Sequence, residues 1–399
     1  MMGTRALVTG GFGFSGSFVV RQLLSEGHDV VATDLPGVLE SSVFRARVAT
    51  IGLDINHPRL TLVPADLLRP KTLSPLSAFC FKHVFHTASL YDYSASLERL
   101  DELNVNATRN LADAMTTQAS LERFVHWSTC GVYGKPIPAS RGPRVNIPFS
   151  ENSSSPKNSD PDARGPEGTK LVNDYSISKW RQEKLLWRIW AERRLPLTVI
   201  RPAPIYGPGS SYGHGGVILC VANGLFPILP RDARNFVNAS VHVEDVARFA
   251  THIVRVDNSL GEDYNVADNG VVSFYEFLRY IALLSGRRMM DLPIVRLSWV
   301  KALFQVVSPV WLLLERRFGV RRVQVFEVQS VRYVNSSYWI SNRKSLDTGF
   351  IYKYSDVKEG LKDTIQWLQE NGWLTDKSKL FERQRVRTDV TKETLTRRA

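Results

Sequence analysis

A glycine-rich turn close to the N-terminus constrains the fold of this chain more than any other feature. The apolar run RALVTG ends in Gly10, and Gly13 and Gly16 follow before a stretch with helical spacing, FSGSFVVRQLLSEG. Gly10 can form the tight turn at the strand end, Gly13 lets a phosphate approach the backbone, and Gly16 allows close packing of the helix on the strand. The positive end of the helix dipole then faces the phosphates. This order of strand, glycines and helix predicts a dinucleotide site.

The acid that ends the second predicted strand indicates which dinucleotide is bound. HDVVATD closes with Asp34, whose carboxylate can accept hydrogen bonds from the adenosine ribose hydroxyls and would repel a 2′-phosphate. Leu35 follows, where a basic residue would favour NADP. We therefore expect NAD, while Arg45 and Arg47 leave NADP open as an alternative.

Strand-like and helix-like stretches alternate along most of the chain. Helical stretches such as LNVNATRNLADAMTTQA and SKWRQEKLLWRIWAERR separate most of the short β-rich runs. Such alternation predicts an α/β fold, with a doubly wound parallel sheet of the Rossmann type and helices on both faces. The β-rich runs are RALVTG, HDVVATD, LTLVPAD, HVFHTAS, RFVHWST and LTVIRP.

Tyr175 and Lys179 lie four positions apart at the start of a predicted helix, which places them on one helical face. A phenol with a pKa of about 10 is a poor base at neutral pH. A neighbouring ammonium and an oxidised nicotinamide ring would stabilise the phenolate, and Lys179 can also hold the nicotinamide ribose. Thr129 ends the predicted strand RFVHWST, at the edge where such sheets bind ligands, so its hydroxyl can bond the substrate oxygen. We predict these three as the catalytic residues, against the alternative of an unremarkable helix surface.

Several ordered motifs between about residues 4 and 375 resemble those of the extended short-chain dehydrogenase/reductase family, also called the NAD-dependent epimerase/dehydratase family. TGGFGFSG is similar to TGxxGxxG, NVNATRN to NVxGTxN, STCGVYG to SSxxVYG, and RPAPIYGP to RPxxVYGP. The resemblance implies that Asp66 contacts adenine, that residues 86–89 line the cofactor, and that the chain forms a homodimer. The predicted cofactor-binding residues are Gly10, Gly13, Phe14, Gly16, Asp34, Asp66, Leu67, Thr87, Ala88, Ser89, Asn104, Tyr175, Lys179, Pro202, Ala203 and Ile205.

Departures from the family motifs discriminate among its chemistries. Sugar-nucleotide dehydratases carry Asp and Glu where this chain has Cys130 and Gly131, so loss of water is disfavoured. Epimerases usually read RxFNVYGP and place an Arg where this chain has Asn238. RPAPIYGP and the closing KSLDTGFIYKYSDVKEGLKDTIQWL instead resemble the 3β-hydroxysteroid dehydrogenase branch. We expect an oxidoreductase for a secondary alcohol or ketone on a bulky apolar substrate. The alternatives are a sugar-nucleotide epimerase and a non-catalytic NAD-sensing or interaction protein.

The positive net charge, with 51 Lys and Arg against 39 Asp and Glu, does not by itself indicate nucleic acid. Basic residues are not interleaved with aromatic residues in a block, and zinc-finger spacing is absent. His86 and His242 lack metal-ligand spacing, so we expect no metal. Three widely spaced cysteines and the lack of an apolar signal-peptide core predict a cytoplasmic protein.

Two apolar features leave alternatives open. Residues 297–318 are mostly apolar, and arginines follow as far as residue 322. This stretch is either an interfacial helix on an anionic membrane, which would make residues 297–322 a peripheral contact, or a helix pair over the substrate pocket. Trp180, Trp187 and Trp190 form either a dimer face or core packing.

The same sequence suggests how the chain divides. A long Pro-rich stretch interrupts the alternating pattern, and a second, helix-rich region follows the last β-rich run. Tyr91 and Tyr93 lie after HTAS and either line the pocket or support it. The predicted parts are an NAD-binding domain of residues 1–202 with an insertion at 135–172 and a return at 236–268, a substrate-binding portion of residues 203–235 and 269–375, and a charged tail of residues 376–399.

Overall fold

The computed structural model describes residues 4–93, 95–134, 149–151, 171–270, 272–292, 294–299, 302–303, 306, 337 and 339–374. Most of the predicted insertion at 135–172 and most of residues 297–322 lie outside the described residues. The predicted tail at 376–399 lies wholly outside them.

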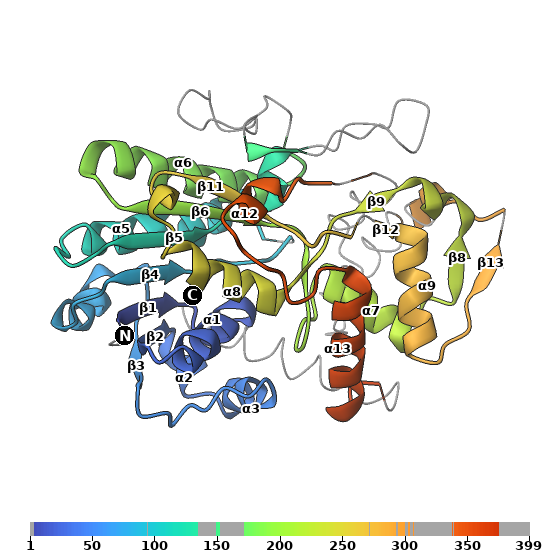
Figure 1. The fold of residues 1–399 in the computed structure, drawn as a ribbon, viewed down its shortest axis with the longest axis horizontal. Helices are drawn as coiled ribbons and strands as arrows, with labels where there is room; N and C mark the ends of the chain where they lie inside the picture. Colours follow the sequence, from blue (N-terminus) through green and yellow to red (C-terminus); the bar gives the residue numbers. More distant parts are fainter. Residues whose placement is uncertain are drawn as a thin grey trace.

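A seven-stranded sheet forms the larger part of the molecule (Figure 1), with the strand order β11-β6-β5-β4-β1-β2-β3. Every neighbouring pair is parallel, which confirms the predicted fold class. Each predicted β-rich run contains one strand, whereas β11 comes from DYNV, a four-residue run that the sequence pattern missed. The strands are β1 (Arg5–Thr9), β2 (Asp29–Asp34), β3 (Leu60–Pro64), β4 (His83–His86), β5 (Arg123–Trp127), β6 (Leu197–Pro202) and β11 (Asp263–Val266).

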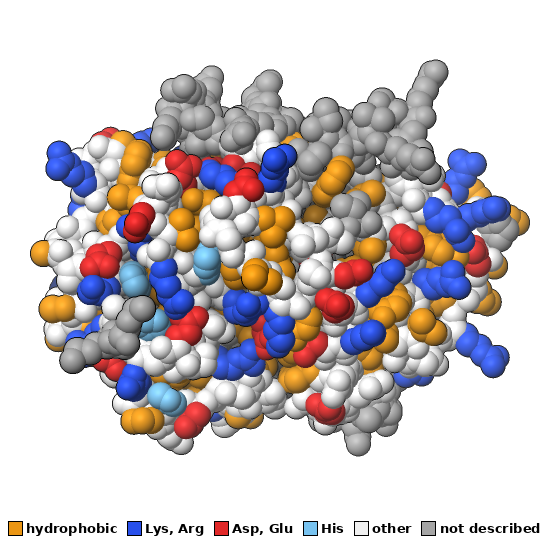
Figure 2. All heavy atoms as spheres, viewed as in Figure 1, with side chains coloured by type: hydrophobic (Ala, Val, Ile, Leu, Met, Phe, Trp, Pro, Cys, Tyr) orange, Lys and Arg blue, Asp and Glu red, His pale blue; other side chains and the backbone are white. Residues whose placement is uncertain are grey.

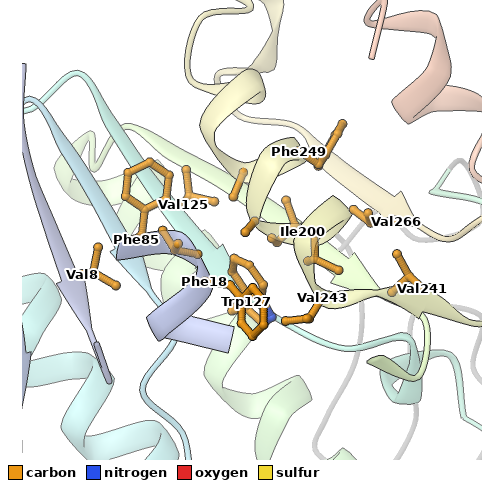
Figure 3. Close-up of a cluster of buried hydrophobic side chains, with 14 of the residues drawn as sticks. Val8, Phe18, Phe85, Val125, Trp127, Ile200, Val241, Val243, Phe249 and Val266 are labelled. Atoms are coloured by element: carbon orange, nitrogen blue, oxygen red, sulfur yellow. The ribbon is translucent and has the colours of Figure 1, made fainter. Parts of the chain in front are cut away.

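Helices cover both faces of this sheet (Figure 1). On one face, Figure 3 shows apolar side chains of the sheet meeting Phe18 of α1 and Phe249 of α8. On the other face, Leu111 of α5 and Leu186 of α6 pack against Val84 and its neighbours. The longer helices are α1 (Phe14–Ser25), α5 (Ala107–Met115), α6 (Asp174–Arg193) and α8 (Val243–Ile253). Shorter elements are α2 (Pro36–Leu39), α3 (Ser42–Thr50), η1 (Pro70–Ala78), α4 (Leu97–Leu100), the π-helical η2 (Asp101–Asn106), η3 (Cys130–Tyr133) and η7 (Asp257–Ser259).

A smaller, mainly helical part has an apolar core of its own, which includes Leu219, Phe277 and Leu361. It lies beyond the sheet at the right of Figure 1. The domain boundaries given above stay a prediction. Its helical elements are α7 (His214–Ala222), η6 (Arg231–Asn235), α9 (Phe274–Leu284) and α13 (Val357–Glu370), while α12 (Arg343–Asp347) lies next to β11. The short strand pairs are β7 (Ile205–Tyr206) with β10 (Val241–His242), β9 (Val237–Asn238) with β12 (Val272–Ser273), and β8 (Ile228–Pro230) with β13 (Met290–Leu292).

Helix α6, which carries the predicted Tyr–Lys pair, has defined ends. The Asn173 side chain accepts a hydrogen bond from the Ser176 N–H at 2.8 Å, an N-cap that satisfies one of the free amides of the first turn. The helix ends at Arg194, which adopts the left-handed conformation with φ 56°. Trp180 and Trp187 are buried within this single chain, which favours core packing over a dimer face, whereas Trp190 is half-buried.

A buried ionic network fixes α6 to the sheet. The Arg201 guanidinium of β6 donates to both carboxylate oxygens of Glu183 on α6, one of them at 3.2 Å. It also donates to the Tyr133 hydroxyl at 3.0 Å and pairs with Asp263 of β11 at 2.6 Å. The Arg201 and Glu183 side chains are fully buried. Breaking such a pair by removing one partner is strongly destabilising, because an uncompensated charge stays buried.

We predict that Arg201→Met lowers the free energy of unfolding by about 3–5 kcal/mol, because Glu183 and Asp263 lose their counter-charge. The matched control is Arg193→Met, which removes an ion pair with Asp113 whose side chains are both more than 40% exposed. That pair should contribute less than about 1 kcal/mol. Urea unfolding of both variants measures the difference, and equal losses would contradict the anchoring role of the buried network.

Candidate functional site

The carboxyl ends of the parallel strands bring the predicted site residues to one edge of the sheet. Thr9, Asp34, His86, Trp127 and Pro202 are the last residues of β1, β2, β4, β5 and β6. Because the strands are parallel, these ends lie on the same side, where open α/β sheets bind their ligands.

The glycine turn after β1 is packed so tightly that side chains are excluded. Gly10 has φ +67°, a conformation that favours glycine. A Cβ on Gly16 would lie 2.1 Å from the Gly10 carbonyl oxygen and 2.7 Å from Thr87 Oγ1. A Cβ on Gly11 would lie 2.8 Å from the Ala32 Cβ, so Gly11 is required as well. The sequence motif predicted roles for Gly10, Gly13 and Gly16 and missed that of Gly11.

This turn fits the phosphates of a dinucleotide. Gly13 is the N-cap of α1 and has no side chain to cap the helix, so the first-turn N–H groups, from Phe14 onward, stay available to an anion. A Cβ on Gly13 would lie 2.9 Å from the Gly10 carbonyl oxygen, within the cradle itself. The turn at Gly10 and the close packing at Gly16 are present as described above, and the approach of a phosphate at Gly13 stays a prediction.

Asp34 lies at the end of β2, directly beside this turn. Its carboxylate accepts hydrogen bonds from the Phe12 N–H at 3.2 Å and from the Leu35 N–H at 2.9 Å. Burial raises the pKa of Asp34 to about 6, against the lowering effect of these amides. The Arg47 guanidinium donates to the Phe12 carbonyl and so lies at the turn, whereas Arg45 is bonded to the Leu39 carbonyl at 2.8 Å. Of the two arginines that leave NADP open, only Arg47 faces the dinucleotide turn.

The residues predicted to line the adenine and nicotinamide sides follow β3 and β4. Asp66 is buried, and its carboxylate accepts a hydrogen bond from the Leu68 N–H at 3.1 Å. Leu67 is buried beside it, and its carbonyl accepts a hydrogen bond from Asn110 Nδ2 at 2.9 Å. Thr87 donates its hydroxyl to the Thr9 carbonyl at 2.7 Å, which ties the segment that continues into Ala88 and Ser89 to the glycine turn.

Other predicted cofactor residues have structural partners of their own. Asn104 is fully buried in the π-helical segment, and its amide bonds the Leu90 backbone and the Ser178 hydroxyl. Pro202, Ala203 and Ile205 follow the end of β6, where the Ala203 N–H donates to the Val266 carbonyl. Their contacts with a cofactor stay a prediction. Among the described residues, no group of three or more His, Cys, Asp and Glu side chains could hold a metal ion.

Lys179 is buried at the end of β5. Its Nζ donates to the Trp127 carbonyl at 2.7 Å, to the Ser89 hydroxyl at 2.9 Å and to the Gln182 side-chain oxygen. Burial lowers the pKa of Lys179 to about 7, while Glu183 acts in the opposite direction. The lysine charge is therefore sensitive to pH near neutrality, and it sits where β4, β5 and α6 meet.

The end of β5 also brings Thr129 to the helix that carries Tyr175. The Ser128 hydroxyl donates to Glu183 of α6 at 2.6 Å, and Thr129 accepts a hydrogen bond from the Gly131 N–H at 3.2 Å. A Cβ on Gly131 would lie 2.9 Å from the Ser176 hydroxyl, so this turn lies against the first turn of α6. The three predicted catalytic residues are thus on neighbouring segments.

Aromatic rings surround Tyr175. The Tyr91 ring lies 4.9 Å from the Tyr175 ring and the Tyr93 ring 5.5 Å from it, both edge to face. Tyr212, from the loop before α7, lies 5.7 Å from Tyr91. Tyrosine rings from both parts of the chain therefore lie around Tyr175, on the side where we expect the substrate.

The sequence pattern of the NAD dependent epimerase/dehydratase family matches residues 6–267. That match covers the sheet, the glycine turn and the Tyr–Lys helix together. The chain belongs to the NAD-dependent epimerase/dehydratase family. NAD is accordingly the cofactor of its dinucleotide site, as the acid at the end of β2 predicts.

Individual relatives in this family have different activities. A 3-beta-hydroxysteroid dehydrogenase of Mycolicibacterium neoaurum is 26% identical over 87% of this chain and 86% of that protein. A UDP-N-acetyl-alpha-D-glucosaminuronate decarboxylase of Bacillus cytotoxicus is 30% identical, over 54% of this chain and 60% of that protein. The structure of a Thermus thermophilus UDP-glucose 4-epimerase in complex with NAD has a TM-score of 0.62 at 22% identity, over 92% of this chain and 99% of that one.

We predict that NAD binding weakens as Asp34 takes up a proton. The pKa of this acid is about 6 in the free protein, so the carboxylate that is predicted to accept the ribose hydroxyls is progressively lost below that pH. The NAD dissociation constant should be about tenfold larger at pH 5 than at pH 7. Isothermal titration across this range measures it. Asp34→Asn should bind NAD more weakly at pH 7 and lose the acid-side dependence, and a variant that keeps this dependence would contradict the assignment.

Proposed function

We propose that the protein is an NAD-dependent oxidoreductase that transfers a hydride between nicotinamide and a secondary alcohol or ketone of a bulky apolar substrate, such as a sterol or another isoprenoid. The observation that carries this proposal is the wall of tyrosine rings around Tyr175. Tyr91 and Tyr93 come from the loop after β4, and Tyr212 comes from the loop before α7. Aromatic faces supply a large apolar contact area to a ring-shaped substrate.

Two further observations favour an apolar substrate over a sugar nucleotide. Arg234 is engaged elsewhere, because its guanidinium lies 3.7 Å from the Tyr275 ring centroid and 3.3 Å from Asp291. In this arrangement the arginine nearest in sequence to Asn238 is therefore paired with side chains of the smaller part. The steroid dehydrogenase relative also aligns with most of this chain, whereas the sugar-nucleotide relative aligns with about half of it.

The catalytic step that we propose uses three side chains. Thr129 and Tyr175 bond the substrate hydroxyl. When bound, NAD supplies the acceptor for the hydride that leaves the alcohol carbon. As that C–H bond breaks, the substrate O–H bond breaks too, and the Tyr175 phenolate oxygen takes the proton, so that a ketone and a phenol are formed. The Lys179 ammonium stabilises the phenolate before the transfer. Ketone reduction is the same path reversed.

We predict that the purified protein reduces NAD when it is given 3β-hydroxysteroids, and that Tyr175→Phe lowers this turnover at least about 100-fold, the usual contribution of an acid–base group. NAD affinity should change less than about threefold, because the lysine that holds the ribose remains. Tyr280→Phe on α9 is the matched control and should retain activity. Absorbance of NADH at a series of steroid concentrations measures the rates.

The alternatives give different results in the same assays. Interconversion of UDP-sugars with a tightly held NAD, and no steroid turnover, would support an epimerase. NAD binding without turnover of any alcohol or sugar nucleotide would support a sensing or interaction protein. Full activity of Tyr175→Phe would refute the assigned base.

We also propose that the chain forms a homodimer, on the family resemblance alone, and that its smaller part contacts an anionic membrane surface. The side chains of Ile294, Trp299, Leu303 and Val306 are all more than half exposed. The last three are spaced by four and three positions, so they share one helical face. Within the described ranges, no helix combines the length and the apolar character that crossing a membrane requires.

Figure 2 shows basic and acidic side chains interspersed over one face of the molecule, without a basic stripe suited to nucleic acid.

We predict that the protein cosediments with vesicles containing phosphatidylglycerol, and that the double variant Trp299→Ser, Leu303→Ser weakens this partition at least about tenfold through loss of buried apolar area. Ile351→Ser removes an equally exposed apolar side chain, 78% exposed, next to α12 and should have no effect. Equal partition of all three proteins would exclude this helical face as the contact.

A further inference from the structure

A hydrogen-bond chain of buried polar side chains lies beneath Lys179, and its first member, Gln182, was not part of any motif. Gln182 follows three positions later on α6 and is fully buried. Its side-chain oxygen accepts a hydrogen bond from Lys179 Nζ at 2.5 Å, and its Nε2 donates to the Thr108 hydroxyl at 2.6 Å. Thr108 in turn lies 2.7 Å from His86 Nε2, and His86 Nδ1 lies 2.7 Å from the Thr9 hydroxyl. The chain thus runs from the catalytic helix to the glycine turn.

Lys179 fixes the direction of the Gln182 hydrogen bonds. An ammonium only donates, so Gln182 must turn its oxygen toward Lys179 and its amide N–H groups toward Thr108. The Gln182 Nε2 also lies 3.4 Å from His86 Nε2 and 3.5 Å from the Ser89 hydroxyl, so its second N–H group has further polar atoms within reach. Burial lowers the pKa of His86 to about 3, so the ring is neutral. The orientation of the Gln182 amide is therefore set by the ammonium, and Thr108 holds its N–H side.

The amide oxygen matters because Lys179 is only 1% exposed. A buried ammonium without acceptors is strongly disfavoured, and its charge is then lost. The acceptors present are the Trp127 carbonyl, the Ser89 hydroxyl and the Gln182 oxygen. The Trp127 carbonyl belongs to the backbone, and the Ser89 hydroxyl can itself donate a hydrogen bond to another group. Gln182 supplies the only side-chain carbonyl of the three.

We propose that Gln182 is a positioning residue for Lys179: its amide oxygen holds Nζ at the end of β5 and keeps the lysine charged, and Thr108 and His86 hold the amide in turn. For NAD binding this inference needs only the family membership of the chain. For proton transfer it rests on the proposed function, in which the ammonium stabilises the Tyr175 phenolate.

The other titratable groups that face Lys179 are few. Glu183 and Tyr175 lie on the same helix, His86 on β4 and His126 on β5. Glu183 is paired with the buried arginine of β6. Burial lowers the pKa of both histidines far below neutrality. On the alkaline side of neutrality, a change in NAD affinity that disappears in Lys179→Met and persists in Tyr175→Phe therefore reports the lysine.

The test is NAD affinity from pH 6 to pH 10 for the wild type, Gln182→Met, Gln182→Glu and the reference Lys179→Met. Wild-type affinity should fall on the alkaline side with a midpoint that Lys179→Met lacks. Gln182→Met removes the acceptor at nearly constant volume, so its midpoint should move about one pH unit lower, with affinity at pH 8 reduced about three- to tenfold. Gln182→Glu keeps an oxygen and adds charge, so its midpoint should move higher. The matched control is Gln22→Met on α1. It removes a glutamine that is hydrogen-bonded to Glu26 and lies outside the hydrogen-bond chain of Lys179, so NAD affinity and its midpoint should not change.

The outcomes separate the inference from the proposed function. Unchanged midpoints in both Gln182 variants, or a wild-type affinity without a lysine-dependent midpoint, would overturn it. Should Gln182→Met fail to fold by thermal unfolding, the direction of the shift in Gln182→Glu decides. If steroid turnover is found, its rate profile should shift with the same midpoints while the KM for the alcohol stays constant. If no alcohol is turned over, the proposed function fails and the NAD titrations still decide the role of Gln182.

Discussion

The buried pairing of Glu183 with Arg201 is the interaction on which the geometry of the site depends. Glu183 is one turn beyond Lys179 on α6, and it is bound at once by the arginine of β6 and by the Ser128 hydroxyl at the end of β5. One carboxylate therefore fixes the rotation of the helix and the end of the neighbouring strand. Lys179 reaches the backbone at the end of β5, next to the segment that carries Thr129, and the ion pair holds α6 against that strand end. Its strength comes from burial, since a displaced helix would leave two charges without partners.

Opposite pKa shifts at Asp34 and Lys179 have the same physical cause. Burial raises the pKa of Asp34 and lowers that of Lys179, because in both cases the charged form loses water. Both groups titrate close to neutrality in the free protein, Asp34 at the end of β2 and Lys179 beside the end of β5. A ligand that bonds the carboxylate and accepts from the ammonium favours both charged forms, so binding and ionisation reinforce each other. We therefore expect the site to bind its ligand best in the pH range between the pKa of Asp34 and the pKa of Lys179.

The sequence predicts the fold and the outline of the site where local chemistry is specific. The roles of Gly10, Gly13 and Gly16 can be predicted from the sequence because the backbone of this turn requires glycine at that spacing. The role of Asp34 can be predicted because the residue ends a strand. The roles of Gln182 and Arg201 cannot be predicted from local sequence, because they depend on partners that are distant in sequence. These partners are Thr108 for Gln182 and Asp263 for Arg201. The strand β11 was missed for a related reason, since two of its four buried residues, Asp263 and Asn265, are polar and it therefore lacks the apolar run expected of a buried strand. Only its pairing with β6 makes it a strand.

The tyrosine wall shows how the two parts of the chain combine in one site. Tyr91 belongs to the loop after β4 of the sheet and Tyr212 to the connection into the smaller part, and their rings meet beside Tyr175. A Cβ on Gly213 would lie 3.5 Å from the Tyr91 hydroxyl, so the two loops are in contact through backbone as well as rings. The rings that cover the proposed base therefore join the two parts of the chain. A ligand that reaches Tyr175 has to replace these ring contacts with contacts of its own, which an apolar surface can supply.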